Sequence, residues 1–140
     1  MNTIAEKSAI EQNKQAVIKF NNEFFGKGNT GITNELLAEN FVNHSAPPNS
    51  PTDESPMVKF VTDFHRGFSD ISVKIQEIFG EDDKVCVRKT ITATHTGEFM
   101  GKQATGKKMI LNIFDIEVLK DGKITDRWNS SDFPQIFQAL

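Results

Sequence analysis

The sequence predicts an α+β fold, with helices packed on one face of an antiparallel sheet, in a single domain that spans residues 1–140. Apolar residues recur at helical spacing as far as Phe68, and after Asp70 apolar and polar residues alternate as they do in half-buried strands. A chain of 140 residues can bury one hydrophobic core but is too short for two ordinary domains. The order is therefore helices first and strands second.

Three helices are predicted before the sheet. The first lies in "SAIEQNKQAVIKFNNEFFGKGN", which has apolar residues near helical spacing and glycines where the helix should stop. A second, short helix is predicted for "TNELLAENFVNH", which delivers Phe41 and Val42 inward and ends at the proline-rich "SAPPNSP". The third helix begins near Asp53 or Ser55, and its apolar stripe is Met57, Phe60, Val61, Phe64 and Phe68.

Four strands are predicted after the helices. The segments "ISVKIQEIFG" and "KVCVRKTITATHT" are joined by the turn-rich "GEDD". The segments "KKMILNIFDIEVL" and "KITDRWNSSD" are joined by a turn at residues 120–122, and Phe133-Pro134 opens a short C-terminal helical turn. Alternating strands predict a sheet with one covered face.

Composition and charge exclude several classes of function. Sixteen Lys and Arg stand against nineteen Asp and Glu with no basic block, so we expect no nucleic acid and no anionic membrane as a partner. The single cysteine, Cys86, excludes an internal disulfide and is interpreted as a buried structural thiol. Neither a signal peptide nor an apolar run of membrane-spanning length is evident. We expect a cytoplasmic protein whose partner is a small molecule or another protein.

The last hairpin allows two registers. A tight two-residue turn loads one face with apolar residues and acids together, namely Leu119, Ile124, Trp128, Asp115, Glu117 and Asp126. A three-residue loop with Gly122 in the left-handed conformation shifts every partner by one, and it sets Phe114 across from Trp128. It also pairs Asp115 with Arg127 on a solvated face. We predict this second register, because it buries apolar groups and neutralises charges at once.

In the predicted register, Asp126 points from the middle of a strand into the apolar face, near Trp128 and, one step diagonally, Asn112. Desolvation there raises the pKa of the carboxyl group and suits it to acid or base catalysis near neutral pH. The alternative is that Asp126 lies near the sheet edge and is satisfied by a backbone donor or by Arg88.

None of the three histidines has metal-ligand spacing with another histidine or a paired carboxylate, so we predict no metal. His44, at a predicted helix end, either lines the mouth of a pocket or is a satisfied junction residue. His65, on the flank of the third helix, could face the sheet. His95 adjoins a glycine-rich turn and is predicted to hold it together. Asp132 is predicted to cap the C-terminal helical turn.

Three segments carry a resemblance to a known family: "FVNHSAPP", the run from "FVTDFHRGF" through "THTGEFMGKQATGKKM", and "FDIEVLKDGKITDRW". From about Leu36 to the C-terminus, the chain resembles the SnoaL-like polyketide cyclase or ester cyclase family. The resemblance implies a cone-shaped fold, as in nuclear transport factor two and ketosteroid isomerase, in which helices and a strongly curved sheet enclose a deep apolar pocket. Many relatives read "EHWD" where this chain reads "DRWN", so Arg127 and Asn129 replace a histidine and an acid.

The resemblance also implies a chemistry, an aldol closure without a cofactor in which an aspartate on the sheet acts as acid and base. Asp126, just before the family's tryptophan, is the candidate for that aspartate, and Asn112 is a possible hydrogen-bond partner. His44 matches the histidine that ends the family's "FVDH"-like motif. The expected substrate is a small apolar, polyketide-like carbonyl compound, in a pocket predicted to be lined by Phe20, Phe41, Phe60, Phe64, His65, Arg88, Phe114 and Trp128.

Two functions are open on the sequence. The first is a cofactor-independent cyclase or isomerase with Asp126 as acid and base. The second is a non-catalytic module of the same fold that binds an apolar molecule or a partner. A homodimer is expected for both, because the family's sheets often pair through their outer faces. The orientation of Arg88 is also open, since inside the pocket it would hold Asp126 ionised.

Overall fold

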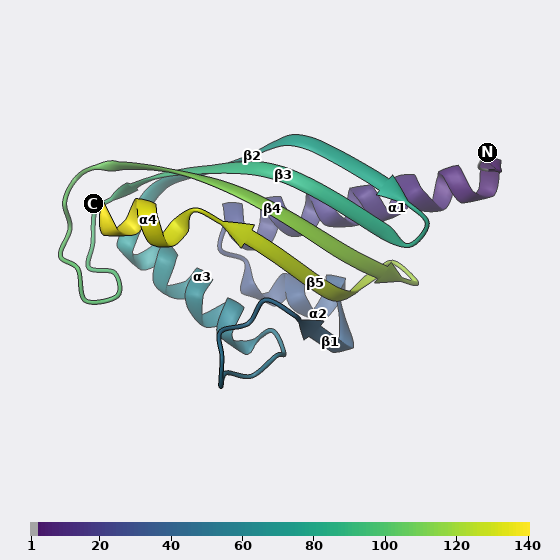
Figure 1. Cartoon of the computed structure of the whole chain (residues 1–140), viewed down its shortest axis with the longest axis horizontal. Helices are drawn as coiled ribbons and strands as arrows, with labels where there is room; N and C mark the ends of the chain where they lie inside the picture. Colours follow the sequence, from purple (N-terminus) through teal and green to yellow (C-terminus); the bar gives the residue numbers. More distant parts are fainter. Residues whose placement is uncertain (1–2) are drawn as a thin grey trace.

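The computed structural model describes residues 3–140 and confirms the α+β fold (Figure 1). The helices are α1 (Ile4–Phe20), which continues as a π-helical segment (Asn21–Gly26), a 3₁₀ turn (Thr30–Ile32), α2 (Thr33–Leu36), α3 (Ser55–Gly67) and α4 (Phe133–Gln138). The strands are β1 (Leu37–Asn43), β2 (Phe68–Glu81), β3 (Lys84–His95), β4 (Lys108–Lys120) and β5 (Lys123–Ser131). No helix within residues 3–140 is both long and apolar enough to cross a membrane.

The five strands form one curved sheet in the order β1-β5-β4-β3-β2. Neighbouring strands are antiparallel except β1, which runs parallel to β5 at the sheet edge. The helices α1 and α3 lie on the same side of the sheet (Figure 1). We call the face toward these helices the inner face and the opposite one the outer face.

The predicted second helix is wrong beyond its first turn. Only Thr33–Leu36 is helical, and the rest of the segment forms strand β1, in which Leu37, Phe41 and Asn43 are buried. A short apolar run fits a helix or a strand equally well, because periodicity alone cannot separate them over so few residues. Pairing with β5 gives the backbone of β1 its hydrogen-bond partners and decides the outcome.

The third helix begins as predicted. The carboxylate of Asp53 accepts hydrogen bonds from the backbone N–H and the hydroxyl of Ser55, at 3.0 and 2.6 Å, and Pro56 occupies the first turn. Its stripe of apolar residues packs on the inner face, with Met57, Val61 and Phe64 buried. This helix forms the wall that faces the sheet across the cavity described below.

The predicted register of the last hairpin is wrong. Asp121 and Gly122 both have positive φ, 52° and 78°, as in a two-residue type I′ turn, and Lys120 pairs with Lys123. A β-bulge then leaves Thr125 unpaired, because Leu119 pairs with Ile124 but Val118 pairs with Asp126. The Thr125 hydroxyl donates to the Val118 carbonyl and lies 2.7 Å from an Asp126 carboxylate oxygen.

Because of the bulge, the residues of β5 beyond Thr125 point to the opposite faces from those that a regular alternation would give them. Beyond it Arg127 faces inward opposite Glu117, while Asp126 and Trp128 face outward. The inner face also carries Asp115, which the predicted register had placed on a solvated surface. Its predicted partnership with Arg127 is present as an ion pair of 2.9 Å, but the pair is buried.

Two apolar clusters fill the space under the inner face. One contains Val85 and Val87 of β3 with Leu119 and Ile124, against α1, α2 and β1. The other contains Ile91 of β3 with Met109, Leu111 and Ile113 of β4, against α3 and α4. Between them along β3 and β4 lies a layer of buried charged residues, Lys89, Asp115 and Glu117.

Candidate functional site

A cavity of about 320 Å³ lies between α3 and the inner face. Its walls are mostly apolar, which suits a compact apolar ligand. The apolar lining residues are Phe25, Pro47, Pro56, Met57, Phe60, Phe64, Ile91, Leu111, Ile113 and Phe133. The polar ones come mainly from the sheet and are Asn43, Lys89, Arg127, Asn129 and Ser131.

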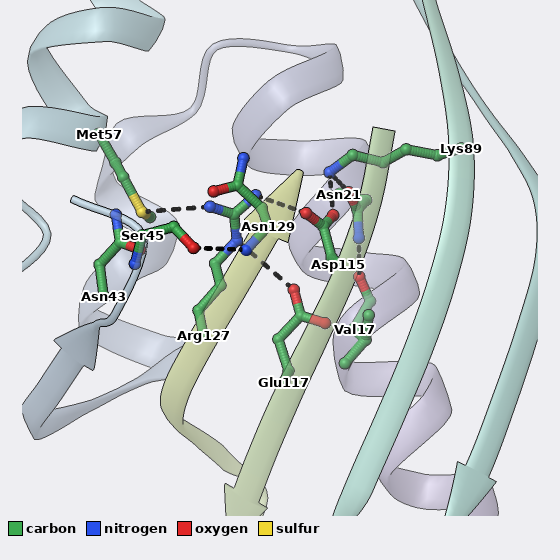
Figure 2. Close-up of polar contacts among 10 residues, drawn as sticks. All are labelled: Val17, Asn21, Asn43, Ser45, Met57, Lys89, Asp115, Glu117, Arg127 and Asn129. Carbon is green, nitrogen blue, oxygen red and sulfur yellow. Dashed lines mark hydrogen bonds and ion pairs between the residues drawn. The ribbon is translucent and has the colours of Figure 1, made fainter. Parts of the chain in front are cut away.

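Lys89 and Arg127 bring two buried cations to the cavity, and Asp115 binds both of them (Figure 2). The ammonium group of Lys89 lies 2.6 Å from one oxygen of Asp115, and Arg127 Nη2 donates to the other oxygen at 2.9 Å. Lys89 also donates to the side-chain carbonyl of Asn21 at 2.6 Å and lies over the ring of Phe25. These contacts fix both cations on the inner face.

Asp115 and Lys89 hold each other in their charged forms. Burial acts to raise the pKa of Asp115, but the cations Lys89 and Arg127 outweigh it, so the net shift is downward. Burial lowers the pKa of Lys89, and the attraction of Asp115 opposes this shift. A buried ion pair of this kind is strongly destabilised when one partner is removed, because the other is left without compensation.

Glu117 has fewer and longer polar contacts than Asp115. Its side chain is fully buried, and within residues 3–140 neither of its carboxylate oxygens accepts a hydrogen bond. The closest cationic atom is Arg127 Nε, 3.6 Å from Glu117 Oε1. Burial, reinforced by repulsion from Asp115, raises the pKa of Glu117 to about 7. This acid can therefore gain or lose a proton near neutral pH.

The guanidinium group of Arg127 has donors to spare. Nη1 meets the thioether sulfur of Met57 at 3.8 Å, and Nε has no hydrogen-bond partner among the described residues. A thioether is a weak acceptor, and an arginine carries five N–H donors. Arg127 is only 4% exposed, so bulk water does not satisfy them. Because Met57 and Arg127 both line the cavity, a ligand oxygen there would be a better acceptor.

The loop after β1 is tied to β5 beside the cavity. The backbone N–H of His44 donates to the carbonyl of Arg127 at 2.8 Å, and that of Asn129 donates to the Ser45 hydroxyl at 2.9 Å. Pro47 of this loop is one of the lining residues. The loop therefore positions one wall of the cavity against the strand that carries Arg127 and Asn129.

The structure brings Asp126, His44 and Trp128 together, but on the outer face. His44 Nε2 lies 2.8 Å from Asp126 Oδ2, and the imidazole stacks on the Trp128 ring with 4.2 Å between centroids. The Asp126 and His44 side chains are 32% and 36% exposed. None of the three lines the cavity. Asp126 and Trp128 share a face with Phe114 and Ile116, as predicted, but the predicted burial of that face is wrong, because the buried face of β4 is the one that carries Asp115 and Glu117.

The predicted direction of the Asp126 pKa is also wrong. The hydrogen bond with His44, followed by that of Thr125, lowers the pKa of Asp126, and burial opposes this only weakly. Both interactions favour the carboxylate over the neutral acid. The catalytic role of Asp126 stays a prediction, for a group that is ionised and bonded to its neighbours.

Other predicted site residues are spread over three environments. Asn112 is on the outer face, where its backbone and side-chain N–H groups donate to Asp132. Arg88 and Phe114 also lie there, Arg88 bound to Glu77 and Phe114 exposed, so Arg88 does not reach the cavity. Of the predicted pocket phenylalanines, Phe60 and Phe64 line the cavity, while Phe20 and Phe41 belong to the neighbouring apolar cluster.

The two remaining histidines hold backbone segments in place. His65 Nε2 lies 2.9 Å from the carbonyl of Phe25. His95 Nδ1 accepts a hydrogen bond from the backbone N–H of Thr105, which confirms that it holds the adjacent turn. Across residues 3–140 no group of three or more His, Cys, Asp or Glu side chains is placed to hold a metal ion. Asp132 is the N-cap residue of α4, but its side chain binds Asn112 rather than the helix end.

Sequence reasoning missed the polar residues that do line the cavity. The sequence pattern favours a solvated surface position for Lys89 and predicts one for Arg127, and Asn129 enters the prediction only as a departure from the family pattern. One signal was available for Lys89, because in "KVCVRKTIT" it shares the alternation of Val85, Val87 and Ile91, the apolar face of its strand. No comparable signal existed for Arg127, since its face depends on the bulge.

The comparisons with known proteins agree with this architecture. Residues 15–140 match the model of the family described as SnoaL-like polyketide cyclase. No curated protein matches the chain in sequence. Among solved structures, AclR, a proposed hydroxylase from Streptomyces galilaeus, is 25% identical with a TM-score of 0.79, covering 92% of this chain and 96% of its own. IdmH, a proposed polyketide cyclase from Streptomyces antibioticus, is 26% identical with a TM-score of 0.77, covering 91% and 96%. The match over residues 15–140 shows that the chain belongs to the SnoaL-like polyketide cyclase family, whose nuclear-transport-factor-two-like fold it adopts.

Proposed function

We propose that this protein is a cofactor-independent cyclase or isomerase that acts on a small, largely apolar carbonyl compound in the cavity between α3 and the inner face. One observation carries the proposal: an apolar cavity borders a buried arginine, Arg127, whose Nη1 has, among residues 3–140, only a thioether as its hydrogen-bond partner. Family membership, together with the likeness to IdmH, a proposed polyketide cyclase, supports the same class of reaction.

Arg127 would act on the carbonyl oxygen of the substrate. When the carbon next to a carbonyl group loses a proton, negative charge develops on that oxygen as the enolate forms. A fixed donor in a buried site stabilises such a charge strongly, because little water competes with it and no reorganisation is needed during the reaction. Asp115 and the Phe25 ring hold Arg127 in place for this role.

The proton that leaves the carbon needs an acceptor. Glu117 has a pKa matched to that task near neutral pH, and it lies directly behind Arg127. In the proposed step, the C–H bond breaks, its electron pair forms the enolate held by Arg127, and a water molecule in the cavity carries the proton to the Glu117 carboxylate, because Glu117 itself does not line the cavity. The total charge of the buried site is then the same before and after the step.

The proposal can be tested without knowing the natural substrate. Small apolar ketones and 1,3-diketones are incubated with the protein in D₂O, and exchange of their α-protons is followed by NMR. We expect catalysed exchange that falls about 100- to 1,000-fold in Arg127→Gln, the usual effect of removing one oxyanion donor. Arg88→Gln is the matched control, because Arg88 is an arginine on the outer face of the same sheet. Equal exchange rates in the wild type and Arg127→Gln, both folded by circular dichroism, would contradict the proposal.

A second candidate, a binding module without catalysis, is favoured by the residues that line the cavity. Among the described lining residues there is no carboxylate and no imidazole, and Asn129 stands where many relatives have an acid. Asp126 is partly exposed and hydrogen-bonded to His44 rather than desolvated. Saturable binding of ketones in the cavity with no α-proton exchange, in the wild type as in Arg127→Gln, would support this module over the enzyme.

A further inference from the structure

The inner face of the sheet holds four buried charged residues: Lys89, Asp115, Glu117 and Arg127. We call them the inner charge cluster. All four side chains are at most 5% exposed, and they touch one another through three ion pairs with Asp115 or Glu117. The other titratable groups nearby do not enter this layer. Arg88 and Glu77 pair with each other on the outer face, and Asp126 pairs with His44 there.

Within the inner charge cluster, the two acids are not equivalent. Asp115 has an ion-pair contact from each of the two cations, at 2.6 and 2.9 Å. Glu117 has one contact at 3.6 Å and no hydrogen bond among the described residues. Asp115 therefore stays ionised, while Glu117 is the member that changes protonation state, consistent with a pKa raised to about 7 by burial.

The protonation of Glu117 decides which ligand charge the cavity accepts. With Glu117 ionised, two cations balance two anions and the cluster is neutral. A negatively charged ligand would then leave one uncompensated negative charge in a buried site, which is costly. With Glu117 protonated, the cluster carries one positive charge, and a single negative charge on the ligand restores the balance.

We infer that the cavity selects ligands with one negative charge on an apolar body, a carboxylate or an enolate placed against Arg127, and that Glu117 takes up a proton from solvent when such a ligand binds. This inference rests on the proposed function of the cavity. The inference also deepens that proposed function. A carboxylate bound to Arg127 and an enolate bound to Arg127, each with a proton on Glu117, have the same distribution of charge. Carboxylate ligands should then resemble the reacting state and bind more tightly than neutral ones.

The test compares benzoate with benzamide, which has nearly the same shape but no charge. Isothermal titration calorimetry at pH 8, in buffers with different heats of ionisation, measures how many protons are taken up. We expect uptake approaching one proton per benzoate and none per benzamide. Because one proton is linked to binding, benzoate affinity should fall by up to about tenfold per pH unit above pH 7.

Two variants isolate Glu117 and Arg127. Glu117→Gln mimics the protonated acid, so benzoate should bind it with the same affinity from pH 6 to pH 9 and without proton uptake. Arg127→Gln should weaken benzoate more than benzamide. Glu77→Gln, which alters a matched acid paired with an arginine on the outer face, should behave as the wild type does.

The outcomes separate this inference from the proposed function. Equal affinity for benzoate and benzamide, with both weakened in Arg127→Gln, would overturn the inference and leave the cavity's proposed function standing. Benzoate binding without proton uptake at pH 8 would also overturn the inference alone. If neither probe binds at millimolar concentration, both proposals fail.

Discussion

Strand β5 contributes one residue to an acid-bearing pair on each face of the sheet. The pKa of the acid is raised in one pair and lowered in the other. On the inner face Glu117 lies 3.6 Å from Arg127, and its pKa is raised to about 7. On the outer face Asp126 lies 2.8 Å from His44, and its pKa is lowered. Asp126 and Arg127 are consecutive residues of β5, so adjacent positions of one strand take part in two different acid-bearing pairs.

The comparison teaches that the pKa of an acid depends on the balance between burial and the contacts its partners make, so that the presence of a basic partner alone does not decide it. Glu117 has a permanently charged arginine beside it, yet burial and the repulsion of Asp115 outweigh that cation. Asp126 is one-third exposed, so its carboxylate keeps part of its hydration and gains hydrogen bonds from His44 and Thr125. The bulge at Thr125 determines which residue receives which environment.

We expect the largest difference between the two faces in the free energy of unfolding, when one acid on each face is neutralised. Asp115→Asn leaves Lys89 and Arg127 without their shared counter-ion in a buried layer, and we expect a loss of about 3–5 kcal/mol in the free energy of unfolding. Asp126→Asn, in an exposed pair, should cost about 0–1 kcal/mol. Urea denaturation at pH 7 measures both. Equal costs for the two variants would show that the inner charge cluster is hydrated.

The next effect concerns the dependence of stability on pH. The pKa of Glu117 is about 7 in the folded protein against an ordinary value of 4.5, so between these pH values the folded state holds a proton that the unfolded chain has released. Its contribution to stability is fully present below 4.5 and is lost as pH rises through 7, by about 3 kcal/mol. Urea denaturation at intervals from pH 4.5 to 8 should show this decline.

Glu117→Gln provides the control for this pH dependence. The amide does not titrate, so the decline above pH 4.5 should be much smaller in the variant, and near pH 8 the variant should be more stable than the wild type. An identical pH profile in both proteins would assign the decline to other groups. Asp126 has the opposite sign, because its lowered pKa makes a contribution that is lost only as pH falls below its ordinary range.

The outer face offers a third comparison, since it exposes several large apolar residues. Ile110, Phe114, Ile116 and Trp128 are each 41–54% exposed there. We predict that two copies pair through this face to form a homodimer. Phe114→Asp places a charge in the middle of the patch and should weaken dimerisation about 100-fold, as measured by light scattering over a range of concentrations. If the wild type is a monomer, this prediction is wrong. Lys120→Asp, at an exposed position away from the patch, is the control.

The sequence alone predicted the first and third helices, the apolar stripe of α3 and the four long strands, because amphipathic periodicity is a local property, but it did not predict β1 between α2 and α3. It did not predict which face Asp126, Arg127 and Trp128 occupy. That outcome depends on the left-handed backbone at Asp121 and on a single extra residue at Thr125, and a shift of one residue moves a whole strand segment to the other face. The burial of Asp115 and Glu117 also depends on Lys89 of β3, a cation that the hairpin of β4 and β5 does not contain.

The smallest expected effect is a change in the pKa of Asp126 when its hydrogen-bond partners on the outer face are replaced. The hydrogen bond with His44 is the largest cause of the lowered pKa of Asp126, and the Thr125 hydroxyl is the second. We expect His44→Leu to raise the pKa of Asp126 toward its ordinary value, and Thr125→Val to raise it less. NMR titration of the Asp126 side-chain carboxyl measures this directly in each protein. The Glu117 carboxyl, titrated in the same samples, should stay near 7, because its environment lies across the sheet. If the pKa of Glu117 shifted together with that of Asp126 in His44→Leu, the two faces would be coupled through β5. The two acids would then not titrate independently.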